Sequence, residues 1–209
     1  MKSFVLLGVL ISGLLGSIVH AQTDDVYVQA AKLTPNLSRG EQAYRLCAAC
    51  HLENGWGKIN GSFPVIASQH RSVIIKQLSD IQNKHRDNPT MYPFSDAKTI
   101  GGVQAIADVA AYIESLPMHP ANGKGDGQHL ALGRQLYVTH CATCHGASGR
   151  GSSEDRYPKI SNQHFAYLIR QLEWMRDGYR TNADPIMLKL IQNMEQQQLE
   201  AVADYVSRL

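Results

Sequence analysis

Cys47-Ala-Ala-Cys-His51 and Cys141-Ala-Thr-Cys-His145 are two copies of one pattern, and together they contain all four cysteines of this 209-residue chain. The C-x-x-C-H spacing is typical of covalent c-type haem attachment, in which both thiols form thioethers and the adjacent imidazole binds the iron. Disulfides and a zinc clamp are the alternatives. Neither explains a histidine directly after the second cysteine in both copies. The sequence therefore predicts two covalently bound haem c groups, held by the four thiols (Cys47, Cys50, Cys141 and Cys144) and by His51 and His145 on the iron.

The first 21 residues resemble an export signal. Lys2 precedes an apolar run that ends at Val19, and Val19-His20-Ala21 provides a small-residue exit. The run is short for a bilayer span, and no basic cluster follows it. We expect a signal peptide over residues 1–21, cleaved after about Ala21, and a periplasmic product without stable membrane insertion.

The charge balance points away from nucleic acid. Twenty basic residues stand against eighteen acidic ones, and neither half of the chain carries a basic excess that would mark a nucleic-acid footprint or a polybasic membrane patch. Partners should therefore be redox proteins that dock through local surface patches.

An internal repeat organises the chain. The two motifs begin 94 residues apart, and other features recur at nearly the same offset. A repeat this long with its own cofactor site is a duplicated domain. We expect domain 1 over residues 22–117, a Pro- and Gly-rich linker over 118–128 and domain 2 over 129–209. The recurring pairs are Gly40 to Tyr44 with Gly133 to Tyr137, Pro64 with Pro158, Gln69-His70 with Gln163-His164, and Ile106 to Leu116 with Leu199 to Leu209.

The secondary-structure pattern is all-α. Apolar residues recur at helical spacing in the terminal segments 106–116 and 199–209. Middle helices are expected over about 72–84 and 165–177, and no convincing strand pattern appears. Ser38 is a plausible N-cap for the helix that leads into the first motif, and residues 131–139 have the same place in the second copy.

The sixth ligand of each iron decides what the chain does, because an open iron binds substrates and a filled one carries electrons. Met91 and Met187 follow the middle helices at matching places, each two residues after a proline. We predict that these two methionines are the sixth ligands. Other candidates fit less well: Met118, Met175 and Met194 lack this register, and His70 and His164 are interpreted as polar packing at helix ends.

The arrangement resembles the dihaem class I cytochromes c, and most closely the cytochrome c4 group, over essentially the whole mature chain. The resemblance implies two tandem class I cytochrome c domains, each wrapped around one covalently bound haem. It also implies that Gly40 and Gly133 allow close helix crossings where Tyr112 and Tyr205 pack, and that the carbonyls of Pro64 and Pro158 accept hydrogen bonds from His51 and His145. The features that carry it are both motifs, Gln69 with Gln77, Gln163 with Gln171, Gly178 with Arg180, Met91, Met187 and the tyrosine-containing terminal helices.

Three positions depart from the family pattern. Leu52 follows the first motif where Gly146 follows the second, and Val73 stands where the second copy has Tyr167. The first copy also lacks an equivalent of Gly178. These differences concern the exposure and potential of the first haem.

The resemblance and the paired methionines imply an electron carrier rather than an enzyme. It would move single electrons from a quinol-oxidising complex or dehydrogenase to a terminal oxidase or reductase. The alternatives are a dihaem enzyme, either a peroxidase or a thiosulfate-oxidising cytochrome, and a cytochrome subunit dedicated to one periplasmic oxidoreductase. A peroxidase needs an open iron, and the thiosulfate-oxidising type is expected to need a further cysteine ligand.

Overall fold

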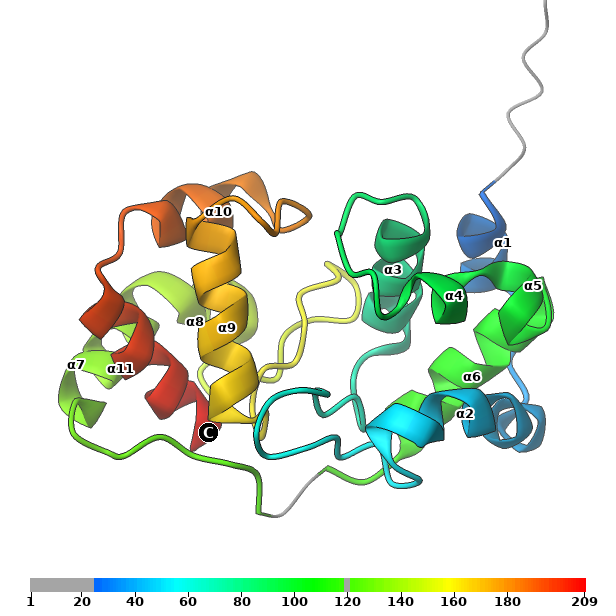
Figure 1. Cartoon of the computed structure of the whole chain (residues 1–209), viewed down its shortest axis with the longest axis horizontal. Coiled ribbons are helices and arrows are strands. Elements are labelled where there is room, and N and C mark those ends of the chain that lie inside the picture. The colour runs from blue at the N-terminus through cyan, green and yellow to red at the C-terminus, as the bar shows by residue number, and fades with distance from the viewer. Residues whose placement is uncertain (1–24, 119–120) are drawn as a thin grey trace, which may run out of the picture.

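The computed structural model describes residues 25–118 and 121–209, which form two helical lobes (Figure 1). The expected signal peptide and its cleavage site lie outside the described residues. The first lobe contains α1 (Val26–Lys32), α2 (Leu37–His51), α3 (Arg71–Gln82), α4 (Tyr92–Ser95), α5 (Ala97–Ile100) and α6 (Val103–Ser115). The second contains α7 (Leu130–Leu136), the π-helical turn η1 (Tyr137–Cys141), α8 (Ala142–His145), α9 (Phe165–Arg176), α10 (Pro185–Gln192) and α11 (Gln196–Ser207).

The all-α expectation is confirmed, with a separate apolar core in each lobe. Within the described ranges the only β pairing is a single bridge between Ser152 and Tyr157. None of the helices in those ranges has the length and apolar character needed to cross a membrane.

Both terminal helices cross the motif-bearing helix of their own lobe at a glycine. A Cβ on Gly40 would lie 2.3 Å from the Asp108 carbonyl oxygen, and one on Gly133 would lie 2.0 Å from that of Ala201. No side chain fits at these separations, so the helices approach backbone to backbone. Beside each crossing a tyrosine pair packs as expected, with ring centroids 5.3 Å apart for Tyr44 with Tyr112 and 5.5 Å for Tyr137 with Tyr205.

The start of α2 differs from the prediction. The N-cap is Asn36 rather than Ser38, because the Asn36 side-chain oxygen accepts a hydrogen bond from the Arg39 backbone N–H at 2.9 Å. Asn and Ser are about equally favourable N-caps, so local sequence alone could not separate them. The buried Asp108 carboxylate on α6 adds the deciding contact, since it accepts from the Asn36 backbone N–H at 2.7 Å.

We expect the Asp108→Asn substitution to destabilise the first lobe by about 3 kcal/mol, because it removes a buried charged acceptor from Arg39 and Asn36. Burial alone would raise the pKa of the Asp108 carboxyl, but hydrogen bonds from Arg39, Asn36 and Gln104 hold it below its usual value of 3.8. A depressed pKa contributes stability above the unfolded-state pKa, and that contribution disappears as the pH falls below about 4. Thermal melts between pH 3 and pH 7 measure both effects, with the exposed Asp126→Asn substitution as the control.

The turn η1 accounts for a small irregularity in the repeat. Gly40 and Gly133 are offset by 93 residues, whereas Cys47 and Cys141 are offset by 94. The second copy therefore has one extra residue between Tyr137, the counterpart of Tyr44, and its first cysteine, and η1 occupies that interval. A π-helical turn accommodates a single additional residue inside a helix. Both the glycine crossing and the cysteine motif keep their places as a result.

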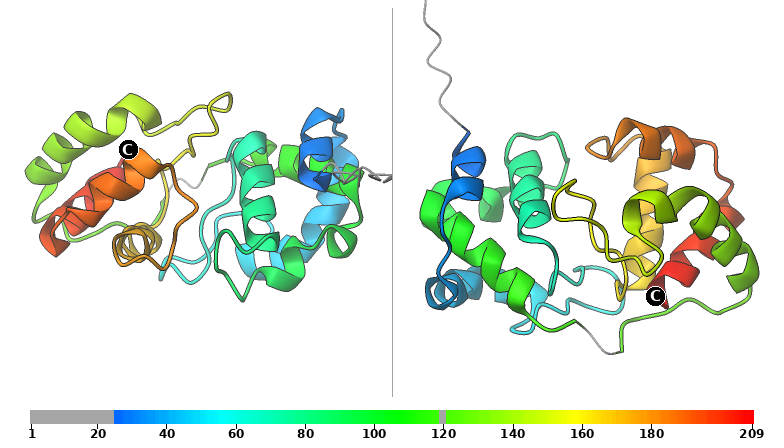
Figure 2. Two further views of the ribbon diagram at one scale, coloured as in Figure 1. Left: turned by 90° about the horizontal axis from the view of Figure 1, so that it is seen from above. Right: turned by 180° about the vertical axis from the view of Figure 1, so that it is seen from behind.

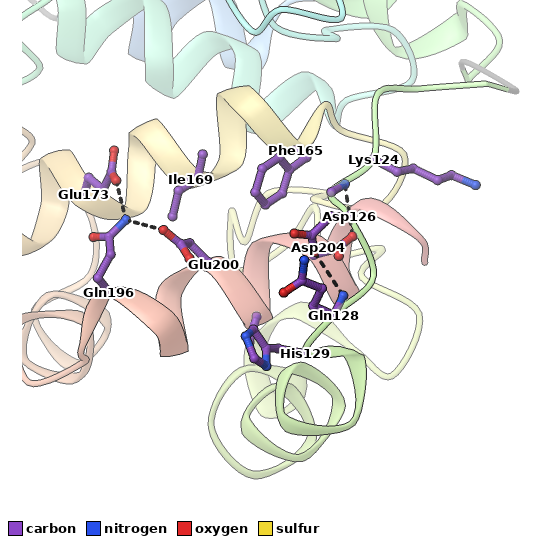
Figure 3. Close-up of a pocket in the computed structure, with 12 residues that line it drawn as sticks. Lys124, Asp126, Gln128, His129, Phe165, Ile169, Glu173, Gln196, Glu200 and Asp204 are labelled. Atoms are coloured by element: carbon purple, nitrogen blue, oxygen red, sulfur yellow. Dashed lines mark hydrogen bonds between the residues drawn. The ribbon is translucent and has the colours of Figure 1, made fainter.

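The lobes also differ at one face. Helix α1, which the sequence analysis did not predict, packs on α3 and α6 in the first lobe. In the second lobe the matching face of α9 and α11 borders a cavity of about 720 Å³, and Figure 3 shows Phe165 and Ile169 along it. None of the predicted ligand residues lines this cavity.

The second half of the expected linker packs against the second lobe. The backbone N–H groups of Gly125 and Gly127 donate to the Asp204 carboxylate at 3.0 and 2.7 Å, and that of Gly123 donates to His164 Nδ1 at 3.0 Å. Both views of Figure 2 show this segment running along the edge of the lobe toward α7.

Candidate haem sites

The four cysteines are free thiols located where a helix ends in each lobe. Cys47 and Cys50 lie on the last turns of α2, and the second pair lies on η1 and α8. Cys47 and Cys141 pack against the two cores, and burial, with a smaller contribution from the neighbouring cysteine, raises the pKa of each thiol to about 11. Cys47 and Cys141 therefore present protonated thiols beside the apolar interior of their lobes.

The two motif histidines have the same environment. His51 and His145 are buried, and the Nδ1 of each lies 3.0 Å from a proline carbonyl oxygen, that of Pro64 or Pro158. Burial lowers the pKa of both imidazoles, although the proline hydrogen bond opposes this. Each ring is thus neutral near pH 7, with the Nδ1 proton donated to the carbonyl and the Nε2 lone pair free for a metal.

A loop follows each histidine, and its first residue has a positive φ angle. Gly146 takes φ +76°, and Leu52 takes φ +67° at the matching position. With ψ 162°, Leu52 lies in a region that is populated almost only by glycine, at a cost of roughly 1–3 kcal/mol for a leucine. The departure identified in the sequence therefore changes the residue without changing the path of the chain. Gly57 and Gly151 then donate back to the carbonyls of His51 and His145 at 3.0 and 2.8 Å.

The two predicted methionines lie on different local structures. Met91 precedes α4 as its N-cap residue, whereas Met187 lies within α10. Helix α10 begins before Met187 because Pro185 occupies its first turn and the Asp184 side chain caps it. Both methionines are half-buried, while Met175 and Met194 are buried in the second core. Those two are already used for packing.

One feature near the candidate sites was not predicted from the sequence, the pairing of Arg86 with Arg180. Arg180 was noted alone, but Arg86 lies 94 residues before it and is its counterpart. Both guanidiniums donate to the same side-chain oxygen of Gln171, at 2.9 and 2.7 Å. Lys84, with φ +59°, takes the place of Gly178, which has φ +81°. The repeat offset itself was the signal that could have revealed Arg86.

The two guanidiniums lack a matching anion. Among the residues that the structure describes, neither forms an ion pair with a carboxylate. Burial and then the proximity of Arg86 lower the pKa of Arg180. Burial would raise the pKa of the Tyr167 hydroxyl, but these two arginines lower it. The side-chain Nε2 of Gln171 is buried without a hydrogen-bond partner. This set of donors fits an acidic group such as a haem propionate.

His70 and His164 lie at the N-cap positions of α3 and α9, as predicted for polar packing at helix ends. The Nε2 partner of each ring belongs to the opposite lobe. His70 Nε2 lies 2.7 Å from the Arg150 carbonyl, and His164 Nε2 lies 2.8 Å from the Trp56 carbonyl.

Comparison with known proteins agrees with this geometry. The family model described as Cytochrome c matches residues 130–209. The cytochrome c4 of Thiocapsa roseopersicina is 32% identical, over 88% of this chain and 98% of its own. That of Azotobacter vinelandii is 28% identical, over 81% of this chain and 87% of its own. The crystal structure of reduced recombinant cytochrome c4 from Pseudomonas stutzeri superposes with a TM-score of 0.74 at 26% identity, covering 84% of this chain and all of that one.

The relatives match across both lobes, and each lobe contains one attachment motif with a buried histidine. The expected fold of two tandem class I cytochrome c domains is therefore confirmed. The chain belongs to the cytochrome c4 family, whose members are electron-transfer proteins that carry two covalently bound haem c groups.

Proposed function

We propose that the protein accepts single electrons from a respiratory donor, a quinol-oxidising complex or a dehydrogenase, and delivers them to a terminal oxidase or reductase. The observation that carries the proposal is the duplicated imidazole arrangement. His51 and His145 are both buried and neutral, with Nδ1 fixed by a proline carbonyl at 3.0 Å. An imidazole that is held in one orientation needs little rearrangement when the charge on its metal changes.

In this proposal His51 and Met91 would bind the first iron, and His145 and Met187 would bind the second. The bound haem supplies one-electron chemistry, and a methionine sulfur favours its reduced form. With two protein side chains on each iron, no position would remain for a small substrate. Electrons would then pass between the haem and its redox partners without any substrate binding at the iron.

The proposal places the protein in the periplasm, after removal of residues 1–21. The supporting observations are the apolar leader in the sequence and the cysteine pairs of the haem-attachment motifs. We assign residues 22–117 and 129–209 to the two domains and 118–128 to the linker. Gly125 and Gly127 of this linker bind the second lobe through Asp204.

Stopped-flow mixing of the reduced protein with a haem–copper oxidase preparation tests the proposal. We expect rapid oxidation in two one-electron steps and negligible steady-state turnover with hydrogen peroxide or thiosulfate. Oxidation of the same protein by a small-molecule oxidant is the control, and it shows that both haems are redox-active. Turnover of peroxide or thiosulfate at the rate of a dedicated enzyme would overturn the carrier function.

A further inference from the structure

Two glutamine side chains bind across the boundary between the lobes in a crossed arrangement. Gln69 donates from Nε2 to the Lys159 carbonyl at 2.8 Å and accepts from the Lys159 N–H at 2.9 Å. Gln163 makes the same pair of bonds to Val65, also at 2.8 and 2.9 Å. The two contacts correspond under the internal repeat. Each amide is fixed in one orientation, because its donor and its acceptor are both used.

The residues that are bound have a direct connection to the candidate ligands. Val65 follows Pro64, whose carbonyl accepts from His51, and Lys159 follows Pro158, whose carbonyl accepts from His145. Each glutamine therefore holds the peptide segment that orients the histidine of the opposite lobe. In each lobe the residue that the glutamine binds is joined by one peptide bond to the proline that the histidine binds.

The same loops are also held at a second point. The crossed contacts of His70 with Arg150 and of His164 with Trp56 lie near the beginning of each loop, and the glutamine contacts lie near its end. Figure 1 shows both loops between α3 and α9. A loop that is bound at both ends by the other lobe cannot shift its proline carbonyl independently of that lobe.

We propose that Gln69 and Gln163 are positioning residues, each of which fixes the axial histidine of the opposite domain. The proposal rests on the proposed function in that it takes His51 and His145 as iron ligands. A carbonyl hydrogen bond to Nδ1–H increases the basicity of an imidazole ligand, which favours oxidised iron. Loosening the proline segment weakens that bond and raises the potential. The effect should therefore appear in the domain that was not mutated.

The two glutamines should differ in the size of their effects. Gln163 and its partner Val65 are both buried, whereas Gln69 is half-buried. Water can replace part of the lost contact at Gln69 but not at Gln163. We expect Gln163→Ala to give the larger shift in reduction potential, and that shift should be observed at the first iron.

The experiment uses the full-length haem-loaded protein with Gln163→Ala and Gln69→Ala. Redox titrations are followed by NMR through the assigned hyperfine-shifted resonances of each histidine ring, which report the two sites separately. Gln163→Ala should raise the potential of the His51 site and shift its ring resonances, while the His145 site stays unchanged. Gln69→Ala should give the reverse pattern with a smaller shift.

Lys76→Met is the matched control. It removes an interdomain contact from Nζ to the Asn182 carbonyl, 3.3 Å, and the Lys76–Asp80 ion pair within the first lobe, without touching either proline segment. Neither histidine should respond to it. If Gln163→Ala fails to accumulate, Gln163→Met, which is similar in length, removes the same two bonds.

A shift confined to the mutated domain, an equal shift at both sites or no shift would each overturn the crossed positioning. Its failure is distinguishable from failure of the proposed ligand set. A wild-type spectrum without methionine coordination would refute Met91 and Met187 as ligands, yet the crossed shift of the histidine resonances would still be observed if the glutamines act as proposed.

Discussion

The Met187→Ala protein should lose about half of the weak near-red absorption band that reports iron–methionine coordination. One of its two potentials should fall by on the order of 100 mV, within the range over which axial ligands set haem potentials. The reason is that a soft thioether stabilises reduced iron, and its removal withdraws that stabilisation. Met91→Ala should remove the other half of the band and lower the other potential. Optical spectra of the oxidised protein and a redox titration measure both.

Met194→Leu is the matched control for this experiment. Met194 is 8% exposed and lies in the second core, and leucine is close to methionine in volume. The variant should keep the whole band and both potentials. A wild-type spectrum typical of two histidine ligands at both irons would show that the methionine assignment is wrong. His70 and His164 would then have to leave their contacts with the opposite lobe.

Replacing both cysteines of one motif should halve the covalent haem content. The Cys141→Ala/Cys144→Ala protein should retain one haem after acid–solvent extraction, bound at the first motif, and Cys47→Ala/Cys50→Ala should retain the other. Intact-mass spectrometry counts the haems directly. Detection of two haems in either double variant would contradict attachment through these four thiols.

The chain prepared without attached haem tests how far each lobe depends on its cofactor. A buried macrocycle would supply apolar contact that a domain of about ninety residues otherwise lacks. We therefore expect the chain prepared without attached haem to lose cooperative thermal unfolding, monitored by circular dichroism. A sharp, native-like melt of the haem-free chain would show that the helices pack without it.

The sequence predicted those helices whose packing is periodic. The spans of α3 and α9 were placed to within two residues, because their apolar positions recur at helical spacing. Helices α1, α4 and α5 were missed, as was α10. All four are too short for periodicity to show, and their starts depend on a capping side chain or a proline.

The attachment motifs were identifiable because their chemistry requires fixed residue types at fixed spacing. The crossed contacts between the lobes were not. Gln69 and Gln163 were noted as matching residues, but their partners are backbone groups of Lys159 and Val65. Any residue other than proline offers the same backbone N–H and C=O, so nothing in a single sequence identifies these backbone partners.

The extra residue in η1 shows how a duplicated chain can change length without losing either function of this helix. An insertion in a regular helix turns all later side chains by about 100° around the axis, which would carry Cys141 away from the core. The π-helical turn confines that change to residues 137–141. Gly133 still meets Ala201 and His145 still meets Pro158. Helix packing and cofactor attachment are therefore kept together in the two copies, because this turn accommodates the one residue by which they differ.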